Sequence, residues 1–374
     1  MFVLYLFPSP GYPGPMDDIP LRTGAHRGAV SNAVGRFEAQ EREAFDDGWG
    51  SAWDEDLPPP RTTVQDDSTR SILARNDSPD LPFDRSINPY RGCEHGCIYC
   101  FARPTHAFLG LSPGLDFETR LFAKPDAPAL LDKELSRKGY VCRPIAIGTN
   151  TDPYQPVERQ RRIMRGVLEV LAAWKHPVAI TTKSGLVARD ADILGPMAAQ
   201  GLASVALSVT TLDRDLARSL EPRASPPLAR LKALRALADA GVPVAVMVAP
   251  VIPGLTDHEL ESILEAAHDH GARAAEFIVL RLPGEVADLF AEWLEARHPR
   301  RAGKVLSLVR QIRGGALYDS RFGDRMSGQG PLAQVLAQRF AGATRRLGMT
   351  PARWTLRNDL FSRPPRAGDQ MALF

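Results

Sequence analysis

Five short runs of apolar and β-branched residues recur along the middle of the chain. The runs span residues 144–149, 178–182, 204–209, 244–249 and 275–280. Continuous apolarity over so few residues is typical of parallel strands that are buried on both faces. The chain is therefore predicted to be an α/β protein built from successive strand–helix units.

The segments between these runs carry apolar residues at positions i, i+3 and i+4, which predicts amphipathic helices. The helices are expected over residues 161–174, 189–200, 225–240 and 256–270. With a further strand near residues 85–91, about six units fit before residue 285, two fewer than in a closed barrel. We predict a partial, open (βα)6 TIM-like barrel, with its chemistry at the carboxyl ends of the strands.

Charge divides the 374-residue chain into three parts that its formal net charge of +2 conceals. Residues 1–80 carry seven Lys and Arg against fourteen Asp and Glu, whereas residues 297–374 carry fifteen against four. We expect an acidic, poorly ordered arm over residues 1–80, because Asp, Pro and Ser are frequent there and no periodicity persists. The barrel is expected over 81–285, and a basic helical extension over 286–374.

Two protein classes are excluded by hydropathy and cysteine usage. The chain has no apolar run near 18 residues, which argues against a membrane span. It has four cysteines, of which three lie within eight residues. A disulfide scaffold spreads its cysteines to join distant segments, so a secreted disulfide protein is not expected. The sequence instead predicts a cytoplasmic protein whose clustered thiols bind a metal or cofactor.

The three clustered cysteines have the spacing C-x3-C-x2-C. Cys93, Cys97 and Cys100 could hold three irons of a [4Fe–4S] cube and leave the fourth iron open to a small molecule. Structural zinc needs a fourth ligand, for which the loop offers His95. Cys97 and Cys100 alone could form a reactive dithiol. We favour the iron–sulfur interpretation, which uses all three thiols, and expect Cys142 to play no part because it precedes the second strand.

With Tyr99 directly before the last cysteine, this loop resembles the signature of the radical S-adenosylmethionine superfamily. The resemblance covers roughly residues 85–285. It implies a [4Fe–4S] cluster and S-adenosylmethionine, which one electron cleaves to a 5′-deoxyadenosyl radical that abstracts hydrogen from a substrate. It also implies an external electron donor of the flavodoxin or ferredoxin type.

Polar segments at the expected strand ends resemble the spore photoproduct lyase-like branch of that superfamily. These segments are 148–154, 182–184, Ser208, 220–226 and 248–250. The resemblance implies that Asn150 and Asp152 lie near the amino group of the cofactor. It implies that Lys183 and Ser208 contact the carboxylate and ribose end, and that Tyr99 also borders the cofactor. A lysine ammonium suits a carboxylate.

Two positions depart from the lyase, whose founding member repairs a thymine dimer in DNA. Thr149 stands where the lyase carries its hydrogen-donor cysteine, and a hydroxyl O–H is too strong to quench a carbon radical. Phe101 stands where the lyase has a second tyrosine. Dimer reversal by the lyase's route is therefore not expected, and the chain resembles an uncharacterised bacterial subgroup of the branch.

The basic C-terminal segment predicts a polyanionic partner. Arginines cluster over residues 297–346, and phosphate contacts would make binding salt-dependent. The final peptide, Gln370–Phe374, resembles the motif by which repair proteins dock on the DNA sliding clamp. We expect a radical enzyme acting on DNA or RNA. The alternatives are an enzyme acting on a protein or small metabolite, and a non-catalytic metal-binding or clamp-docking adaptor.

Overall fold

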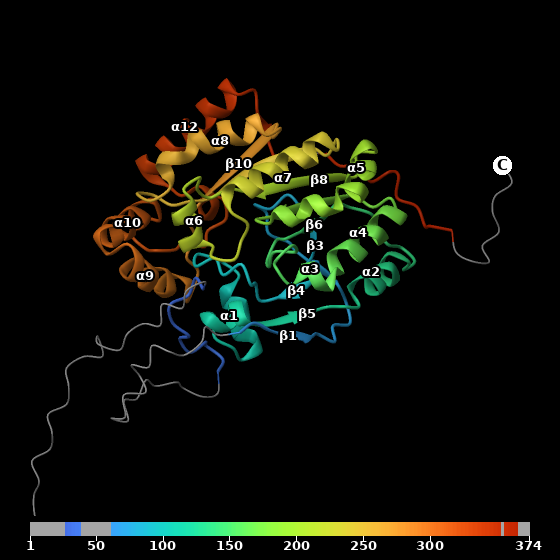
Figure 1. The fold of residues 1–374 in the computed structure, drawn as a ribbon, viewed down its shortest axis with the longest axis horizontal. Helices are drawn as coiled ribbons and strands as arrows, with labels where there is room; N and C mark the ends of the chain where they lie inside the picture. Colours follow the sequence, from blue (N-terminus) through green and yellow to red (C-terminus); the bar gives the residue numbers. More distant parts are fainter. Residues whose placement is uncertain (1–26, 39–60, 353–354, 366–374) are drawn as a thin grey trace, which may run out of the picture.

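The computed structural model describes residues 27–38, 61–352 and 355–365 of the chain and has an eight-stranded sheet at its centre (Figure 1). Seven neighbouring strands of this sheet run parallel, and six of them form the barrel. They are β3 (Arg85–Ile87), β6 (Ile145–Ile147), β7 (Val178–Thr182), β8 (Ala203–Ser208), β9 (Val244–Val251) and β10 (Ala274–Val279). Within the described residues β10 does not pair with β3, so the sheet stays open. The prediction of a partial (βα)6 barrel is confirmed.

The helices that cover the sheet lie close to the predicted positions (Figure 1). They are α4 (Ile163–Ala173), α5 (Ala191–Ala199), α7 (Pro227–Asp239) and α8 (Leu260–Asp269). Gly201, Gly241 and Gly271 follow three of them with φ values of 73°, 77° and 98°, a backbone conformation in which glycine ends a helix without steric cost. Short helices occupy loops elsewhere: α1 (Leu115–Thr119), α2 (Ala127–Leu135), α3 (Glu158–Arg161) and α6 (Arg214–Leu220).

Residues 61–80, which we assigned to the acidic arm, contribute two strands. Strand β2 (Leu73–Arg75) pairs antiparallel with β3 and forms one edge of the large sheet. The opposite edge is formed by β11 (Thr350–Pro351), from the C-terminal part of the chain. Strand β1 (Thr63–Asp66) joins a smaller sheet with β5 (Arg120–Ala123) and β4 (Tyr90–Arg91). Long-range pairing therefore orders a segment that has no periodicity of its own.

Two helices of the C-terminal extension form a hairpin beside the cysteine loop. These are α9 (Val286–Arg297) and α10 (Pro299–Ile312), whose buried faces share a hydrophobic cluster with Cys97, Ile98 and Tyr99. The chain continues through α11 (Asp324–Ser327) and α12 (Gly330–Arg346). Since α12 packs on α8, ion pairs such as Arg339–Glu261 offset part of its charge. No helix of the described residues is long and apolar enough to cross a membrane.

Residues 355–365 cross the amino end of the barrel. The amide of Arg357 donates to the carbonyl of Gly201, and the amide of Ser362 donates to that of Trp174. The ring of Phe361 stacks on that of Trp174, with 5.5 Å between the ring centroids, and it also contacts the rings of Tyr140 and His176. These contacts fill the end of the barrel opposite the strand ends at which we predicted chemistry.

Candidate cluster and cofactor site

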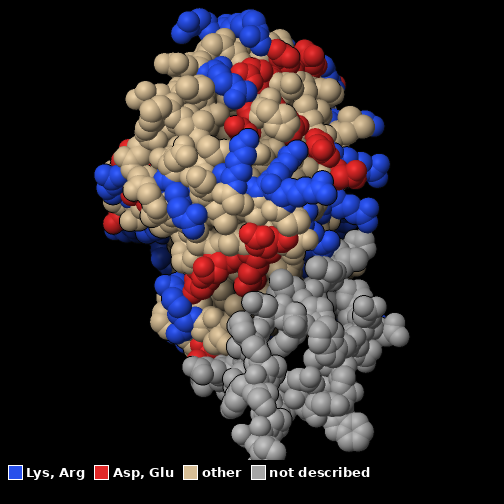
Figure 2. Space-filling view, turned by 90° about the vertical axis from the view of Figure 1, so that its left-hand side faces the viewer, with Lys and Arg blue, Asp and Glu red and all other residues tan. Residues whose placement is uncertain are grey.

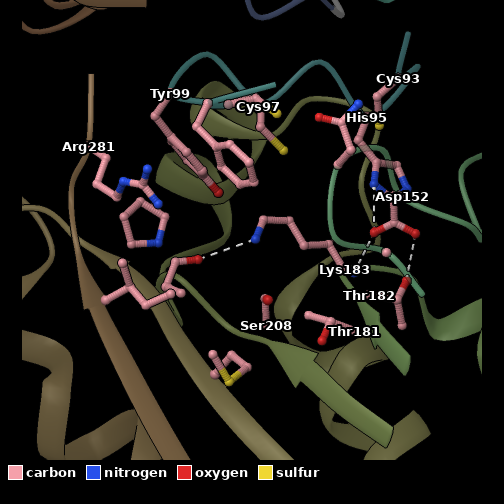
Figure 3. Close-up of a pocket in the computed structure, with 18 of the residues that line it drawn as sticks. Cys93, His95, Cys97, Tyr99, Asp152, Thr181, Thr182, Lys183, Ser208 and Arg281 are labelled. Atoms are coloured by element: carbon pink, nitrogen blue, oxygen red, sulfur yellow. Dashed lines mark hydrogen bonds and ion pairs between the residues drawn. The ribbon is translucent and has the colours of Figure 1, made fainter. Parts of the chain in front are cut away.

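A pocket lies at the carboxyl ends of the parallel strands, as predicted (Figure 3). One wall consists of the loop that carries Cys93, Cys97 and Cys100. The opposite walls consist of residues at, near or just beyond the carboxyl ends of the strands: Asn150, Asp152, Thr182, Lys183, Ser208, Ala249, Pro250 and Arg281. All eight residues that we predicted for metal and cofactor binding line this one pocket. Cys142 lies outside it, before β6.

The chemistry of the three thiols fits a bound metal group. Cys93 and Cys97 are each 6% exposed, and burial raises the pKa of all three thiols. A buried thiolate therefore needs the positive charge of metal ions. Among the described residues, no three His, Cys, Asp or Glu side chains converge as a single ion would require. A cube makes no such demand, because each cysteine ligates a different iron.

A buried ion pair holds the cysteine loop from behind. Arg103 and Glu118, both fully buried, form a 2.5 Å contact. The Arg103 guanidinium also donates to the carbonyls of Gly96 and Cys97, at 3.1 Å and 2.9 Å. Carbonyl dipoles that are tied to one rigid guanidinium cannot rotate freely. Arg103 therefore fixes the backbone on both sides of the Cys97 amide, at the second cysteine of the loop.

The N-terminal segment covers the same loop from outside. The amides of Gly28 and Ala29 donate to the two carboxylate oxygens of Glu118, at 3.0 Å and 2.8 Å. A Cβ atom at Gly28 would lie 1.8 Å from the carbonyl oxygen of Gly96. Only glycine permits this approach. The segment therefore closes the side of the loop that faces away from the pocket.

Asp152 links the cysteine loop to the end of β7. Its carboxylate accepts hydrogen bonds from the Thr182 hydroxyl and the Lys183 amide, both at 2.7 Å, and from the Tyr154 amide at 2.9 Å. It lies 3.4 Å from Nδ1 of His95. Burial would raise the pKa of Asp152, but His95, the Lys183 amide and the Thr182 hydroxyl lower it to about 2. The carboxylate is thus charged and largely occupied by contacts within the protein.

Lys183 supplies a cation at the centre of the pocket. Its ammonium lies 3.2 Å from the carbonyl oxygen of Ala249 and 5.8 Å from the centre of the Tyr99 ring. Ser208, at the end of β8, is 4% exposed and borders the same space. The backbone amide of Asn150 donates to Asn88, which holds the loop after β6. The pocket thus offers a cation, a hydroxyl and an amide near the thiols.

A second buried carboxylate anchors Tyr99. Glu221 accepts hydrogen bonds from the hydroxyls of Tyr99 and Thr210 and from the guanidinium of Arg230. Burial would raise the pKa of Glu221, but the charges of Arg230 and Lys183 lower it to about 2. Arg230 also donates to the carbonyl of Ser208 at 2.9 Å. This network fixes the tyrosine of the cysteine loop relative to the end of β8.

Sequence reasoning missed most of these supporting charges. No sequence motif includes Arg103, Glu118 or Arg230. Of these charges, only Glu221 lies in a segment that we quoted for its resemblance, residues 220–226. Each charge finds its partner through the fold. Thr149 is not among the pocket-lining residues, whereas Phe101 lines the pocket and is 47% exposed.

Comparison with known proteins identifies the family. Residues 87–267 match the family model of the radical SAM superfamily. Uncharacterized proteins of Mycobacterium tuberculosis and Mycobacterium bovis are each 40% identical over 233 residues, which cover 62% of this chain and 68% of theirs. An uncharacterized protein of Methanocaldococcus jannaschii is 27% identical over 46% of this chain and 62% of its own.

Solved structures agree on the fold. Spore photoproduct lyase complexed with dinucleoside spore photoproduct aligns with a TM-score of 0.55 and 18% identity, over 78% of this chain and 82% of that one. A variant of that lyase with bound S-adenosylmethionine aligns equally well. In this chain, the fold places the loop of Cys93, Cys97 and Cys100 beside a pocket at the strand ends. The chain belongs to the radical S-adenosylmethionine superfamily.

Proposed function

We propose that this radical S-adenosylmethionine enzyme abstracts hydrogen from a nucleotide of DNA or RNA. The convergence of the buried Cys93 and Cys97, the half-buried Cys100 and Lys183 on one pocket carries the enzymatic part of the proposal. When bound there, a [4Fe–4S] cluster and S-adenosylmethionine supply a 5′-deoxyadenosyl radical after the cluster receives one electron. The donor of that electron is proposed to be a flavodoxin or ferredoxin.

The residues of the chain have separate roles in this proposal. Cys93, Cys97 and Cys100 hold the cluster. Lys183 binds the carboxylate of the cofactor, since its ammonium is unpaired with any acid within 4 Å among the described residues. Ser208 and Asn150 bind its ribose and amino ends. Asp152 orients the end of β7, because three donors already occupy its carboxylate.

A basic helix face supports a nucleic-acid substrate. Arg300, Arg301 and Lys304 are exposed on α10, and none has an acidic partner within 4 Å in the part of the chain that the structure describes. Figure 2 shows Lys and Arg gathered in a band on the side where α9 and α10 lie. The structural neighbour that holds a dinucleoside lesion points to the same substrate class. The predicted clamp-docking peptide, Gln370–Phe374, lies outside the described residues, and none of the relatives and structures named above supports clamp docking.

Anaerobic reconstitution tests the enzymatic part. The wild-type chain should bind about four irons, as one cubane cluster does, and release 5′-deoxyadenosine upon reduction. Cys93→Ala, Cys97→Ala and Cys100→Ala should each lose the cluster absorbance and the product. Cys142→Ala is the matched control and should retain both, since Cys142 lies outside the pocket. Binding of zinc alone by the wild type would refute this function.

Salt-dependent binding of a DNA oligonucleotide tests the substrate part. Replacing Arg300, Arg301 and Lys304 with glutamine should reduce the slope of log affinity against log salt by about 2 to 3, because each phosphate contact contributes roughly 0.9. The matched control replaces Lys133, Arg137 and Lys138, which are exposed near the end of α2. Equal losses in both variants would contradict a specific role for α10.

A further inference from the structure

Arg281 lies in the pocket but serves neither the cluster nor the residues around Asp152. It follows β10 by two residues, and Figure 3 shows it on the side of the pocket opposite Asp152 and His95. Its guanidinium carbon lies 5.4 Å from the centre of the Phe101 ring. One terminal nitrogen lies 3.4 Å from the sulfur of Met326. These two contacts hold the side chain in place.

Most of the hydrogen-bonding capacity of Arg281 is unused. Thioether sulfur is a weak acceptor. The Nε atom is buried without a hydrogen-bond partner, and no carboxylate lies within 4 Å among the residues that the structure describes. The buried Arg313 differs, because its guanidinium donates to the carbonyls of Val279, Leu280 and Asp324. A guanidinium with free donors in a pocket is suited to an acceptor on a ligand.

The charges around Arg281 favour an anionic acceptor. Arg313 is 2% exposed and lies close enough for the two cations to repel each other. Burial, followed by the charge of Arg281, lowers the pKa of Arg313 to about 10. Asp319 and Asp324 act on Arg313 in the opposite sense, each more weakly than Arg281. The two guanidinium groups therefore keep a positive potential that a bound anion relieves. The planar fork of Arg281 matches the oxygens of a phosphate or a carboxylate.

Phe101 distinguishes between these two anions. Its ring borders the pocket, lies beneath Arg281, and leaves 47% of the residue exposed. An exposed aromatic ring beside an arginine is the arrangement on which single-stranded nucleic acids stack their bases. We propose that Arg281 and Phe101 form a nucleotide subsite, in which Arg281 binds a backbone phosphate and Phe101 stacks a base. This proposal rests on the nucleic-acid substrate proposed above.

The test compares two dinucleotides on the reconstituted holoenzyme. One probe is thymidylyl-thymidine with a natural phosphodiester, and the other is its methylphosphonate, whose linkage is neutral. The wild type should bind the phosphodiester about tenfold more tightly or better, since a hydrogen bond to a charged group is worth at least that factor. Arg281→Gln should bind both probes equally, and Arg281→Lys should keep part of the preference.

Three controls separate the outcomes. Arg137→Gln, an exposed arginine after α2, should leave both affinities unchanged. Phe101→Ala should lower the affinity for both probes to the same extent, whereas Phe101→Trp should bind both probes with the wild-type affinity. The affinity for S-adenosylmethionine should be unaltered in Arg281→Gln, and circular dichroism should show that each variant folds.

The outcomes that overturn the subsite are distinct. If Arg281→Gln still prefers the charged probe, the phosphate is bound elsewhere and only the subsite fails. If Arg281→Gln instead loses affinity for S-adenosylmethionine, Arg281 binds the cofactor and the subsite fails. If the wild type binds neither dinucleotide, the subsite fails together with the proposed nucleic-acid substrate. If the wild type instead prefers a carboxylate-bearing peptide, a protein substrate replaces the nucleic acid.

Discussion

Polar side chains converge at the carboxyl end of the barrel, whereas aromatic rings pack together at its amino end. At the carboxyl end, Asp152 and Glu221 each accept three hydrogen bonds, so their orientations are fixed before a ligand binds. At the amino end, Phe361 contacts Trp174, Tyr140 and His176. Buried charges contribute little net stability, while apolar burial contributes directly. The pocket end is thus built for orientation and the opposite end for stability.

Replacing Glu221 tests whether orientation at the pocket end depends on paired charge. Glu221→Gln would leave Arg230, which is 2% exposed, without its counter-charge. Breaking a buried pair costs about 3 to 5 kcal/mol, so we expect a loss of that size in the free energy of unfolding. Urea denaturation measures it.

The matched control for Glu221 is a surface pair. Glu261→Gln removes the partner of Arg339, and both of these side chains are about one-third exposed. The loss there should be below about 1 kcal/mol. Similar losses of unfolding free energy in the two variants would show that burial does not increase the contribution of the Glu221–Arg230 pair to stability.

Replacing Phe361 tests the amino end. Phe361→Ala removes a partly buried ring from three aromatic neighbours and should lower the free energy of unfolding by about 2 to 3 kcal/mol, less than for a fully buried ring. The affinity for S-adenosylmethionine should not change. A parallel loss of cofactor affinity in folded protein would show that the two ends are coupled.

Filling the space at Gly28 probes the outer side of the cysteine loop. Gly28→Ala would place a Cβ atom against the Gly96 carbonyl, so we expect a destabilisation of about 1 to 3 kcal/mol and lower iron content after reconstitution. Gly303→Ala is the control. Gly303 lies in α10 with open space around it, and alanine there should stabilise the helix by up to about 1 kcal/mol. Full iron content in Gly28→Ala would contradict this role.

Acidification should weaken the amino end through His176. Burial lowers the pKa of His176 from 6.5 to about 4, so the unfolded chain binds the proton more tightly. Stability is therefore complete above about pH 7 and falls as the pH drops from 6.5 toward 4, by about 1 to 2 kcal/mol at pH 5. His176→Gln should be less stable at pH 7 but lose less between pH 7 and 5. An unchanged pH dependence in that variant would assign the effect to other groups.

The sequence predicted the regular parts of the molecule because they rest on local patterns. Strand β7 coincides with the predicted residues 178–182, since a β-branched run determines it directly. The cysteine loop was equally visible, because its spacing is local. The pairing of Glu118 with the amide of Gly28 spans 90 residues and leaves no local trace. Likewise Arg281 has meaning only once β10 places it beside Phe101.

Residues 355–365 leave the barrel at the end opposite the cysteines, because Arg357 and Ser362 bond to turns that precede β8 and β7. A linker attached after residue 365 would therefore start at the amino end of the barrel, away from the mouth of the pocket. Immobilised on a surface through such a linker, the molecule would present its pocket outward. A long polymeric substrate could then approach without steric interference from the support.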